Sequence, residues 1–292
     1  MEPHILPFQL KRPVGQRPVF LPTSPEFGMK KLLALGLDRI FQICPAFRDE
    51  PRSPEHHPEF TLLEFYESHL SLEGLQQRVE DLFRFLCIQL HGSPSFVRGN
   101  EKIDLSRPWR RFRVPDLFET VLKLDLRAHP TSESLHAVCS AHGLSSSADE
   151  PWDDLYFKLW LNCIEPTLPK HEAFFVTHYP LSQSSLCNPI VDESGFAWGN
   201  RFEVYVGTTE LGNAFDELRD ADRQRNNFLK DQDTRRKAYE NRYPESPIDE
   251  ELLDAIVKMR PTSGIAIGFD RLAMILMDAS KIEEVLFLES YC

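Results

Sequence analysis

Two hydrophobic periods occur along this chain, and together they predict an α+β fold. Apolar side chains recur at helical spacing over residues 75–90, which predicts an amphipathic helix. That helix carries Leu75, Val79, Leu82, Phe83, Leu86 and Leu90. IFQICPAF (40–47) alternates as a buried strand, and Thr61–Tyr66 is expected to be its antiparallel partner. AFFVTHY (173–179) and RFEVYVG (201–207) predict two more strands.

Capping signals and prolines set the limits of other helices. Ser24 with Pro25 behind it is a typical helix start and Gly36 a typical stop. The stretch at about 93–172 is predicted to be mostly helical and cut into short pieces by six prolines, Pro108, Pro115, Pro130, Pro151, Pro166 and Pro169. Strands interrupted by helices, with one hairpin, favour an antiparallel sheet flanked by helices over a parallel doubly wound sheet. We expect one domain over 1–292, with 93–172 as an insertion.

Composition narrows the class of protein. A chain of 292 residues can bury a full core. Its net charge of −12 argues against the broad, positively charged surface along the phosphate backbone that tRNA binding requires. Six cysteines without a CxxC pair are typical of reduced thiols in a cytoplasmic protein. No signal sequence and no apolar run of membrane-spanning length occur, so no membrane partner is expected.

The segment FRDE (47–50) has residue types that suit the activation of a carboxylic acid by ATP. A carboxylate is already a nucleophile at neutral pH, so the site must supply positive charge for the α-phosphate rather than a base. A fixed guanidinium, for which we choose Arg48, and a divalent metal provide that charge. Glu50 lies two positions further along a strand, on the same face, and could accept a hydrogen bond from the adenine amino group.

Two further segments complete the predicted nucleotide site. HHPEFTLLEFY begins at His56, which a loop could bring to the γ-phosphate, and it contains Phe60. GIAIGFDR (264–271) has two glycines that let the backbone approach the nucleotide, and Asp270 and Arg271 open an apolar helix. Phe60 and Arg271 are expected to sandwich the adenine. Each short pattern alone is usually a surface ion pair or a turn, and the signal lies in their order and separation.

These segments carry a resemblance to a known family. FRDE with HHPEFT resembles motif 2 of class II aminoacyl-tRNA synthetases, and GIAIGFDR resembles motif 3. The lysyl branch is indicated by TSPEFGMKKLLALG from Thr23, EFTLLEFY from Glu59 and TELGNAFDELRDADRQ from Thr209. HYPLSQSSL from His178 and PIDEELLDAI from Pro247 resemble a paralogous group in that branch, the elongation factor P lysine lysyltransferases. The resemblance covers most of the chain and is weakest at about 93–172.

The resemblance implies a set of site residues. The ATP-binding residues are Arg48, Asp49, Glu50, His56, His57, Phe60, Glu210, Leu211, Gly268 and Arg271, with Arg48 and Arg271 catalytic. The amino-acid contacts are Ser24, Pro25, Glu26, Tyr66, Glu217 and Ala266. Mg²⁺ is expected between Glu210 and Glu217, because oxygen ligands suit this ion. A spacing of seven puts these two acids on opposite faces of a straight strand, so a bend near Gly212 is required.

Ala266 is the residue that bears most on substrate choice. True lysyl synthetases usually have glycine at this position, and the protein-modifying group has alanine. A methyl group takes space from an α-amino substituent and favours a β-amino acid, whose amine lies one carbon further along. We therefore expect (R)-β-lysine in preference to α-lysine, by roughly 1–3 kcal/mol for a difference of methylene size.

Three classes of function are compatible with these residues. The first is transfer of a lysyl or β-lysyl group from its adenylate to a lysine of elongation factor P, with ATP and Mg²⁺. The second is the same adenylate with a tRNA or a small amine as acceptor. The third is a non-catalytic paralogue, which the presence of Arg48, Glu50, Glu210, Glu217 and Arg271 disfavours. No anticodon-binding domain and no tRNA partner are expected, and a homodimer is left open.

Overall fold

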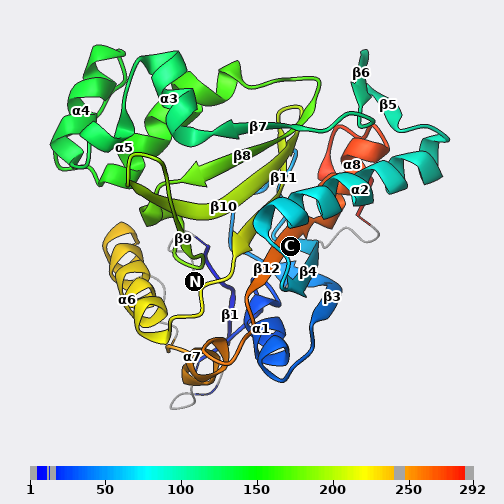
Figure 1. Cartoon of the computed structure of the whole chain (residues 1–292), viewed down its shortest axis with the longest axis horizontal. Helices are drawn as coiled ribbons and strands as arrows, with labels where there is room; N and C mark the ends of the chain where they lie inside the picture. Colours follow the sequence, from blue (N-terminus) through cyan, green and yellow to red (C-terminus); the bar gives the residue numbers. More distant parts are fainter. Residues whose placement is uncertain (1–4, 12, 14–17, 240–246, 287–292) are drawn as a thin grey trace.

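An eight-stranded mixed sheet is the centre of the molecule in the computed structural model, which describes residues 5–11, 13, 18–239 and 247–286 (Figure 1). The strand order is β3-β4-β12-β11-β10-β8-β7, with β9 paired to β10. The strands are β3 (Arg39–Phe47), β4 (Glu59–Ser68), β7 (Arg110–Arg113), β8 (Ala173–Tyr179), β9 (Pro189–Val191), β10 (Ala197–Val206), β11 (Thr209–Asp216) and β12 (Thr262–Gly268). Only β7 and β8 pair in parallel, so the predicted antiparallel sheet is confirmed.

One face of this sheet is covered by α2 (Leu72–His91) and α8 (Phe269–Leu276). The α2 helix begins where the Ser71 side chain accepts the Gly74 N–H and ends at Gly92, whose φ of 71° needs glycine. Its apolar stripe packs on alternate residues of β10 and β12, among them Phe202 and Ile265. The predicted amphipathic helix is confirmed, although Leu90 is exposed.

On the opposite face, the described helices pack at the two ends of the sheet. At one end lie α3 (Val114–Leu122), α4 (Ser132–Ala141) and α5 (Trp152–Leu159), with the short turns η1 (Leu126–Ala128), η2 (Trp160–Ile164) and η3 (Glu165–Thr167). At the other end lie α1 (Glu26–Ala34), α6 (Ala221–Ala238) and α7 (Glu250–Ile256). Between these two apolar clusters, the middle of the sheet lines a cavity.

The stretch 93–172 differs from its prediction at its start. It opens with the hairpin β5 (Ser95–Arg98) and β6 (Glu101–Asp104), and β7 then joins the main sheet. Helices begin only at Val114. The sequence of β7 is RRFR, in which strand pairing with β8 outweighs the lack of apolar alternation. The remaining elements are β1 (Gln9–Leu10), β2 (Val19–Phe20), η4 (Leu181–Gln183) and η5 (Ile282–Glu284).

The strand predicted at 40–47 is present, but the prediction that it is buried is wrong. β3 forms as expected, but Phe41 is 73% exposed and Ile43 is 51% exposed. The cause is the position of β3 as the edge strand of the sheet, where no helix covers these two side chains. No helix in the described ranges is both long and apolar enough to span a bilayer. The five described cysteines are free thiols, and Cys292 lies outside the described residues.

Candidate active site

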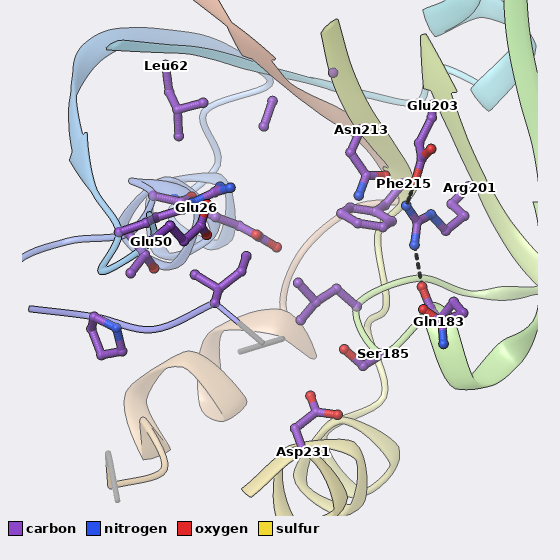
Figure 2. Close-up of a pocket in the computed structure, with 18 of the residues that line it drawn as sticks. Glu26, Glu50, Leu62, Gln183, Ser185, Arg201, Glu203, Asn213, Phe215 and Asp231 are labelled. Carbon is purple, nitrogen blue, oxygen red and sulfur yellow. Dashed lines mark hydrogen bonds and ion pairs between the residues drawn. The ribbon is translucent and has the colours of Figure 1, made fainter. Parts of the chain in front are cut away.

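A single cavity of about 1900 Å³ lies over the open middle of the sheet. Its floor includes a row of residues that face one another across four strands, since Glu64 of β4 pairs with Ala266 of β12, Ala266 with Asn213 of β11, and Asn213 with Glu203 of β10. All four line the cavity. In Figure 2, Glu26 and Glu50 lie on one side of this space, and Gln183, Arg201 and Glu203 lie on the other.

Arg48 stands at the β3 end of the cavity. Its backbone N–H donates to the Pro58 carbonyl at 2.9 Å and closes the hairpin loop between β3 and β4. Its guanidinium lies over the Phe60 ring, 5.0 Å from the centroid. Its Nε is buried and has no hydrogen-bond partner in the described part of the chain. An anionic ligand would satisfy this donor, because an unmade buried hydrogen bond to a charged group is costly.

Arg271, at the start of α8, joins three segments. Its Nε donates to the Glu55 carbonyl at 3.1 Å and its Nη1 to the Glu210 carbonyl at 3.0 Å. Phe60 and Arg271 both line the cavity. The sandwich of the adenine between them stays a prediction, and the Arg48 guanidinium lies over the Phe60 ring in this structure. The predicted helix after GIAIG is confirmed as α8.

The loop after Arg48 carries the two predicted histidines. His56 Nδ1 lies 2.8 Å from Ser53 Oγ, and partial burial, with the nearby charge of Arg271, lowers the pKa of His56. His57 is buried, and its Nδ1 lies 2.6 Å from the Glu59 carbonyl oxygen and 3.2 Å from the Glu59 backbone nitrogen. Both line the cavity with Glu50.

At the α1 end of the cavity, two carboxylates hold one lysine, and a third carboxylate lies close by. Lys30 Nζ lies 2.5 Å from Glu26 Oε1 and 2.6 Å from Glu217 Oε2, and both Lys30 and Glu217 are buried. Burial alone would lower the pKa of Lys30, but the charges of Glu217 and Glu26 outweigh it and raise that pKa. Lys30 therefore stays protonated, and it neutralises part of the acidic cluster.

Glu64 is the third carboxylate, and we did not predict it. It accepts hydrogen bonds from Ser24 Oγ at 2.6 Å and from the Tyr66 hydroxyl at 2.9 Å. Burial, with the charge of Glu26, raises the pKa of Glu64 to about 7. The sequence held a signal for this residue, since Glu64 shares the inward face of β4 with Leu62 and Tyr66.

Gly264 has a different role from the one expected. A Cβ added there would lie 2.2 Å from Cδ1 of Tyr66 and 2.5 Å from Glu217 Oε1. Gly264 thus makes room for these two side chains rather than for a nucleotide. Gly268 lines the cavity, and a Cβ there would meet nothing closer than 3.6 Å.

The expected bend in β11 is present, but the expected metal pair is not. Tyr205 pairs with Glu210 and Val204 with Gly212, so Leu211 is the extra residue of a β-bulge. The bulge brings Glu210 to the cavity side, whereas Glu217 lies seven residues further on, roughly 20 Å away along an extended strand. Glu217 is also held by Lys30 and does not line the cavity. Glu210 and Glu217 therefore cannot share one ion.

Glu203 is the acid that the geometry offers in its place. It lines the cavity with Glu210 and accepts hydrogen bonds from the hydroxyls of Tyr179 at 2.6 Å and Tyr205 at 2.8 Å. Arg201 Nη2 lies 2.5 Å from Glu203 Oε1, and Figure 2 shows Arg201 reaching both Glu203 and the Gln183 carbonyl. No group of three or more potential metal ligands occurs among the described residues. Glu203 and Glu210 offer two carboxylates, and phosphate oxygens and water would complete the coordination shell. Such a shell suits Mg²⁺, which is seldom bound by protein ligands alone.

The structure brings most of the predicted residues to one cavity. The predicted residues that line it are Ser24, Glu26, Arg48, Glu50, His56, His57, Phe60, Glu210, Leu211, Ala266, Gly268 and Arg271. Those that do not line it are Pro25, Asp49, Tyr66 and Glu217. The cavity residues absent from our prediction include Glu64, Arg201, Glu203 and Asn213, and Asn213 Oδ1 is buried with no hydrogen-bond partner in the described ranges.

Comparison with known proteins agrees with this geometry. A family model described as tRNA synthetases class II (D, K and N) matches residues 4–290. A lysine–tRNA ligase of Rhizobium etli is 34% identical over 284 residues, which are 96% of this chain and 55% of that protein. An elongation factor P–(R)-beta-lysine ligase of Salmonella paratyphi B is 35% identical over 292 residues, which cover 97% of this chain and 82% of that protein. The chain thus spans about half the length of the lysine–tRNA ligases it matches.

Proposed function

The chain belongs to the class II tRNA synthetase family of the D, K and N type, and from this premise we propose that it is an ATP-dependent ligase for a lysine-type amino acid. We propose further that the acyl group passes through an adenylate to the ε-amine of a lysine on elongation factor P. One observation carries the first part: a single cavity holds the Arg48 guanidinium and the acidic cluster of Glu26 and Glu64. Such a site matches a substrate with one carboxylate and two ammonium groups.

In the first step, a carboxylate oxygen of the amino acid attacks the α-phosphorus of ATP. A new O–P bond forms, the bond to the bridging oxygen breaks, and pyrophosphate leaves with that electron pair. Arg48 is suited to hold the α-phosphate oxygens as their charge grows, because its buried Nε has no hydrogen-bond partner among the described residues. Phe60, under the same guanidinium, offers a ring face to the adenine.

Mg²⁺ would be held by Glu203 and Glu210, which reach the cavity from adjacent strands. The ion supplies charge neutralisation for the phosphates when it is bound. The hydroxyls of Tyr179 and Tyr205 and the guanidinium of Arg201 fix the Glu203 carboxylate in place. Such support for a metal ligand orients it before the ion arrives.

The amino-acid end suits a dication. Glu26 and Glu64 line the cavity, and a fixed anion in a partly dry pocket attracts an ammonium more strongly than it would in water. Asn213 Oδ1 offers a further acceptor beside Ala266. The Ala266 methyl lies between the strands that carry Glu64 and Asn213, and this position supports a preference for (R)-β-lysine over α-lysine.

In the second step, the lone pair of a neutral acceptor amine attacks the carbonyl carbon of the adenylate. An amide bond forms, the C–O bond to the phosphate breaks, and AMP leaves with that electron pair. A lysine side chain is an ammonium at neutral pH, so it must lose one proton before it can attack. The nitrogen then loses a second proton to water as the amide forms.

A tRNA acceptor is the second candidate, because relatives named lysine–tRNA ligase match 96% of this chain. The net charge of −12 favours a protein acceptor over a polyanion. The chain covers 82% of the relative named for elongation factor P and 55% of the lysine–tRNA ligase of Rhizobium etli.

The test is amino-acid-dependent exchange of pyrophosphate into ATP with α-lysine, (R)-β-lysine, ornithine, aspartate and asparagine. We expect exchange to be strongest with (R)-β-lysine and to fall by at least about a hundredfold in Arg48→Ala. Arg39→Ala is the matched control, since Arg39 is an exposed arginine at the start of β3, the strand that ends at Phe47 just before Arg48. The acceptor is then identified by measuring whether labelled β-lysine is transferred to elongation factor P or to tRNA. The absence of exchange with every acid would contradict adenylate formation and favour a non-catalytic paralogue.

A further inference from the structure

The cavity is larger than its two predicted small substrates require. Its volume of about 1900 Å³ exceeds the roughly 300–1,000 Å³ of ordinary ligand pockets. ATP is assigned to the end near Arg48 and the amino acid to the end near Glu26. The remaining part extends past Gln183 to a mouth between α5 and α6, which face each other in Figure 1.

One wall of this mouth is a single face of α5. Asp153, Asp154 and Phe157 line the cavity, and their spacing of three and four places them side by side on the helix. Phe157 is 39% exposed although it is aromatic. Leu181, on the adjacent turn η4, is also exposed and lines the cavity. This wall therefore combines two carboxylates with an open apolar surface.

The two acids of α5 differ from other acids around them. Neither Asp153 nor Asp154 forms an ion pair with a described lysine or arginine, and one carboxylate oxygen of Asp153 is buried without a hydrogen-bond partner. By contrast, Glu150 pairs with Lys158. Acids in the first turn of a helix interact favourably with the helix dipole. That interaction does not explain an exposed aromatic ring on the same face.

The opposite wall is the polar face of α6. Asn226, Asn227, Lys230 and Asp231 line the cavity there, and Asn227 donates to the Ser185 carbonyl at 2.7 Å. Figure 2 shows Asp231 directed from α6 toward Ser185. The α6 wall is hydrophilic and tied to the loop after η4, so the mouth has one acidic and apolar side and one mixed polar side.

We propose that this mouth binds the acceptor as a polypeptide segment with cationic side chains beside the lysine that is modified. Asp153 and Asp154 bind those cationic groups, and Phe157 packs against the aliphatic stems. The acceptor lysine then extends along the cavity toward the adenylate. This inference rests on the proposed function and adds the surface that selects the acceptor. A nucleic-acid acceptor would be repelled by the same two carboxylates.

The experiment separates activation from transfer. The double variant Asp153→Asn, Asp154→Asn is compared with Glu119→Gln, Glu133→Gln, which removes the same charge from exposed sites on α3 and α4 outside the cavity. We expect normal pyrophosphate exchange in both. With elongation factor P as acceptor, KM should rise about five- to tenfold only in the first variant, as for the loss of two partly exposed ion pairs. The salt dependence of that KM should also weaken in this variant alone.

Phe157→Ala should raise the same KM without changing its salt dependence, because it removes an apolar contact. Equal KM values in the double variant and its control, with normal exchange, would overturn this inference alone. A lower KM for tRNA in Asp153→Asn, Asp154→Asn would overturn it in favour of a nucleic-acid acceptor. Failure of exchange in the unmodified protein would overturn the proposed function and this inference with it.

Discussion

Lys30 Nζ lies 2.6 Å from Glu217 Oε2, and both side chains are buried beside the amino-acid end of the cavity. The same ammonium is 2.5 Å from Glu26. An internal cation thus lies among the acids at this end of the cavity. Glu217 therefore holds Lys30 outside the cavity, while Glu26 and Glu64 line it.

Lys30→Met should destabilise the protein strongly. It leaves Glu26 and Glu217 without their shared cation, and breaking a buried pair costs about 3–5 kcal/mol. The measurement is urea unfolding at pH 8. Lys31→Met is the matched control, because Lys31 is 31% exposed and pairs with Asp249 and Glu251 at the surface. It should cost less than about 1 kcal/mol. Equal losses in the two variants would contradict the structural role of Lys30.

Gly264→Ala should abolish amino-acid activation. The new methyl would lie 2.2 Å from Tyr66 and 2.5 Å from Glu217, so both side chains must move, at a cost of about 1–3 kcal/mol in stability. Gly28→Ala on α1 is the control, because Gly28 lies outside the cavity and an added Cβ there meets no atom within 4 Å. Exchange of pyrophosphate with lysine is measured for both. An active Gly264→Ala enzyme would show that the position of Tyr66 does not matter.

Local sequence patterns predicted the helices and strands, but the site depends on contacts between residues that are far apart in the sequence. The spacing of Leu75, Val79 and Phe83 sufficed for α2, because one helix face meets one sheet. Lys30 looks like a surface residue in its own helix, and its burial depends on Glu217, which is far away in sequence. The exposure of Phe41 depends on which strand is at the sheet edge, and the sequence of β3 does not contain that information.

The cavity acids were predicted in part for a similar reason. Glu210 and Glu217 stand out in one motif, and the strand spacing correctly required an irregularity near Gly212. Glu203 lies in the strand before that motif, where it pairs with Asn213, and it reaches the same cavity as Glu210 because β10 and β11 form a hairpin with a bulge. To predict that these two carboxylates share a cavity, the register of the strands is needed, and alternation alone does not give it.

Glu64 should make stability depend on pH. Its pKa is raised by burial from 4.5 to about 7, so between these values the folded protein holds a proton that the unfolded chain releases. The stability contributed by this group is therefore present below pH 4.5 and lost as pH rises through 7, by about 3 kcal/mol in total. Glu64→Gln should remove this dependence of stability on pH. Unfolding free energies of the two proteins at pH 5 and pH 8 are compared, with Glu67→Gln on the other face of β4 as control. Parallel pH curves for the unmodified protein and Glu64→Gln would contradict the raised pKa.

Glu203→Gln and Glu210→Gln should each raise the Mg²⁺ concentration needed for half-maximal pyrophosphate exchange by about tenfold or more, because each removes a charged oxygen ligand. Glu217→Gln should not change this concentration, since Glu217 pairs with Lys30 away from the cavity. Titration of exchange with Mg²⁺ at fixed ATP measures the effect. A shift in Glu217→Gln without one in Glu203→Gln would restore the pair that the sequence suggested.

Ala266→Gly should shift amino-acid preference toward α-lysine. The Ala266 methyl lies in register with Glu64 on one side and Asn213 on the other, at the floor of the cavity. Its removal opens space for an α-amino group, and a change of methyl size is worth roughly 1–3 kcal/mol, or about 10- to 200-fold in relative kcat/KM. Exchange rates with α-lysine and (R)-β-lysine are measured in the same preparation, so their ratio is independent of any loss of folded protein. Ala273→Gly on α8 removes a methyl outside the cavity and should leave the ratio unchanged. If the ratio is the same in Ala266→Gly as in the unmodified protein, the methyl does not select the substrate, and the preference must come from the acids around it.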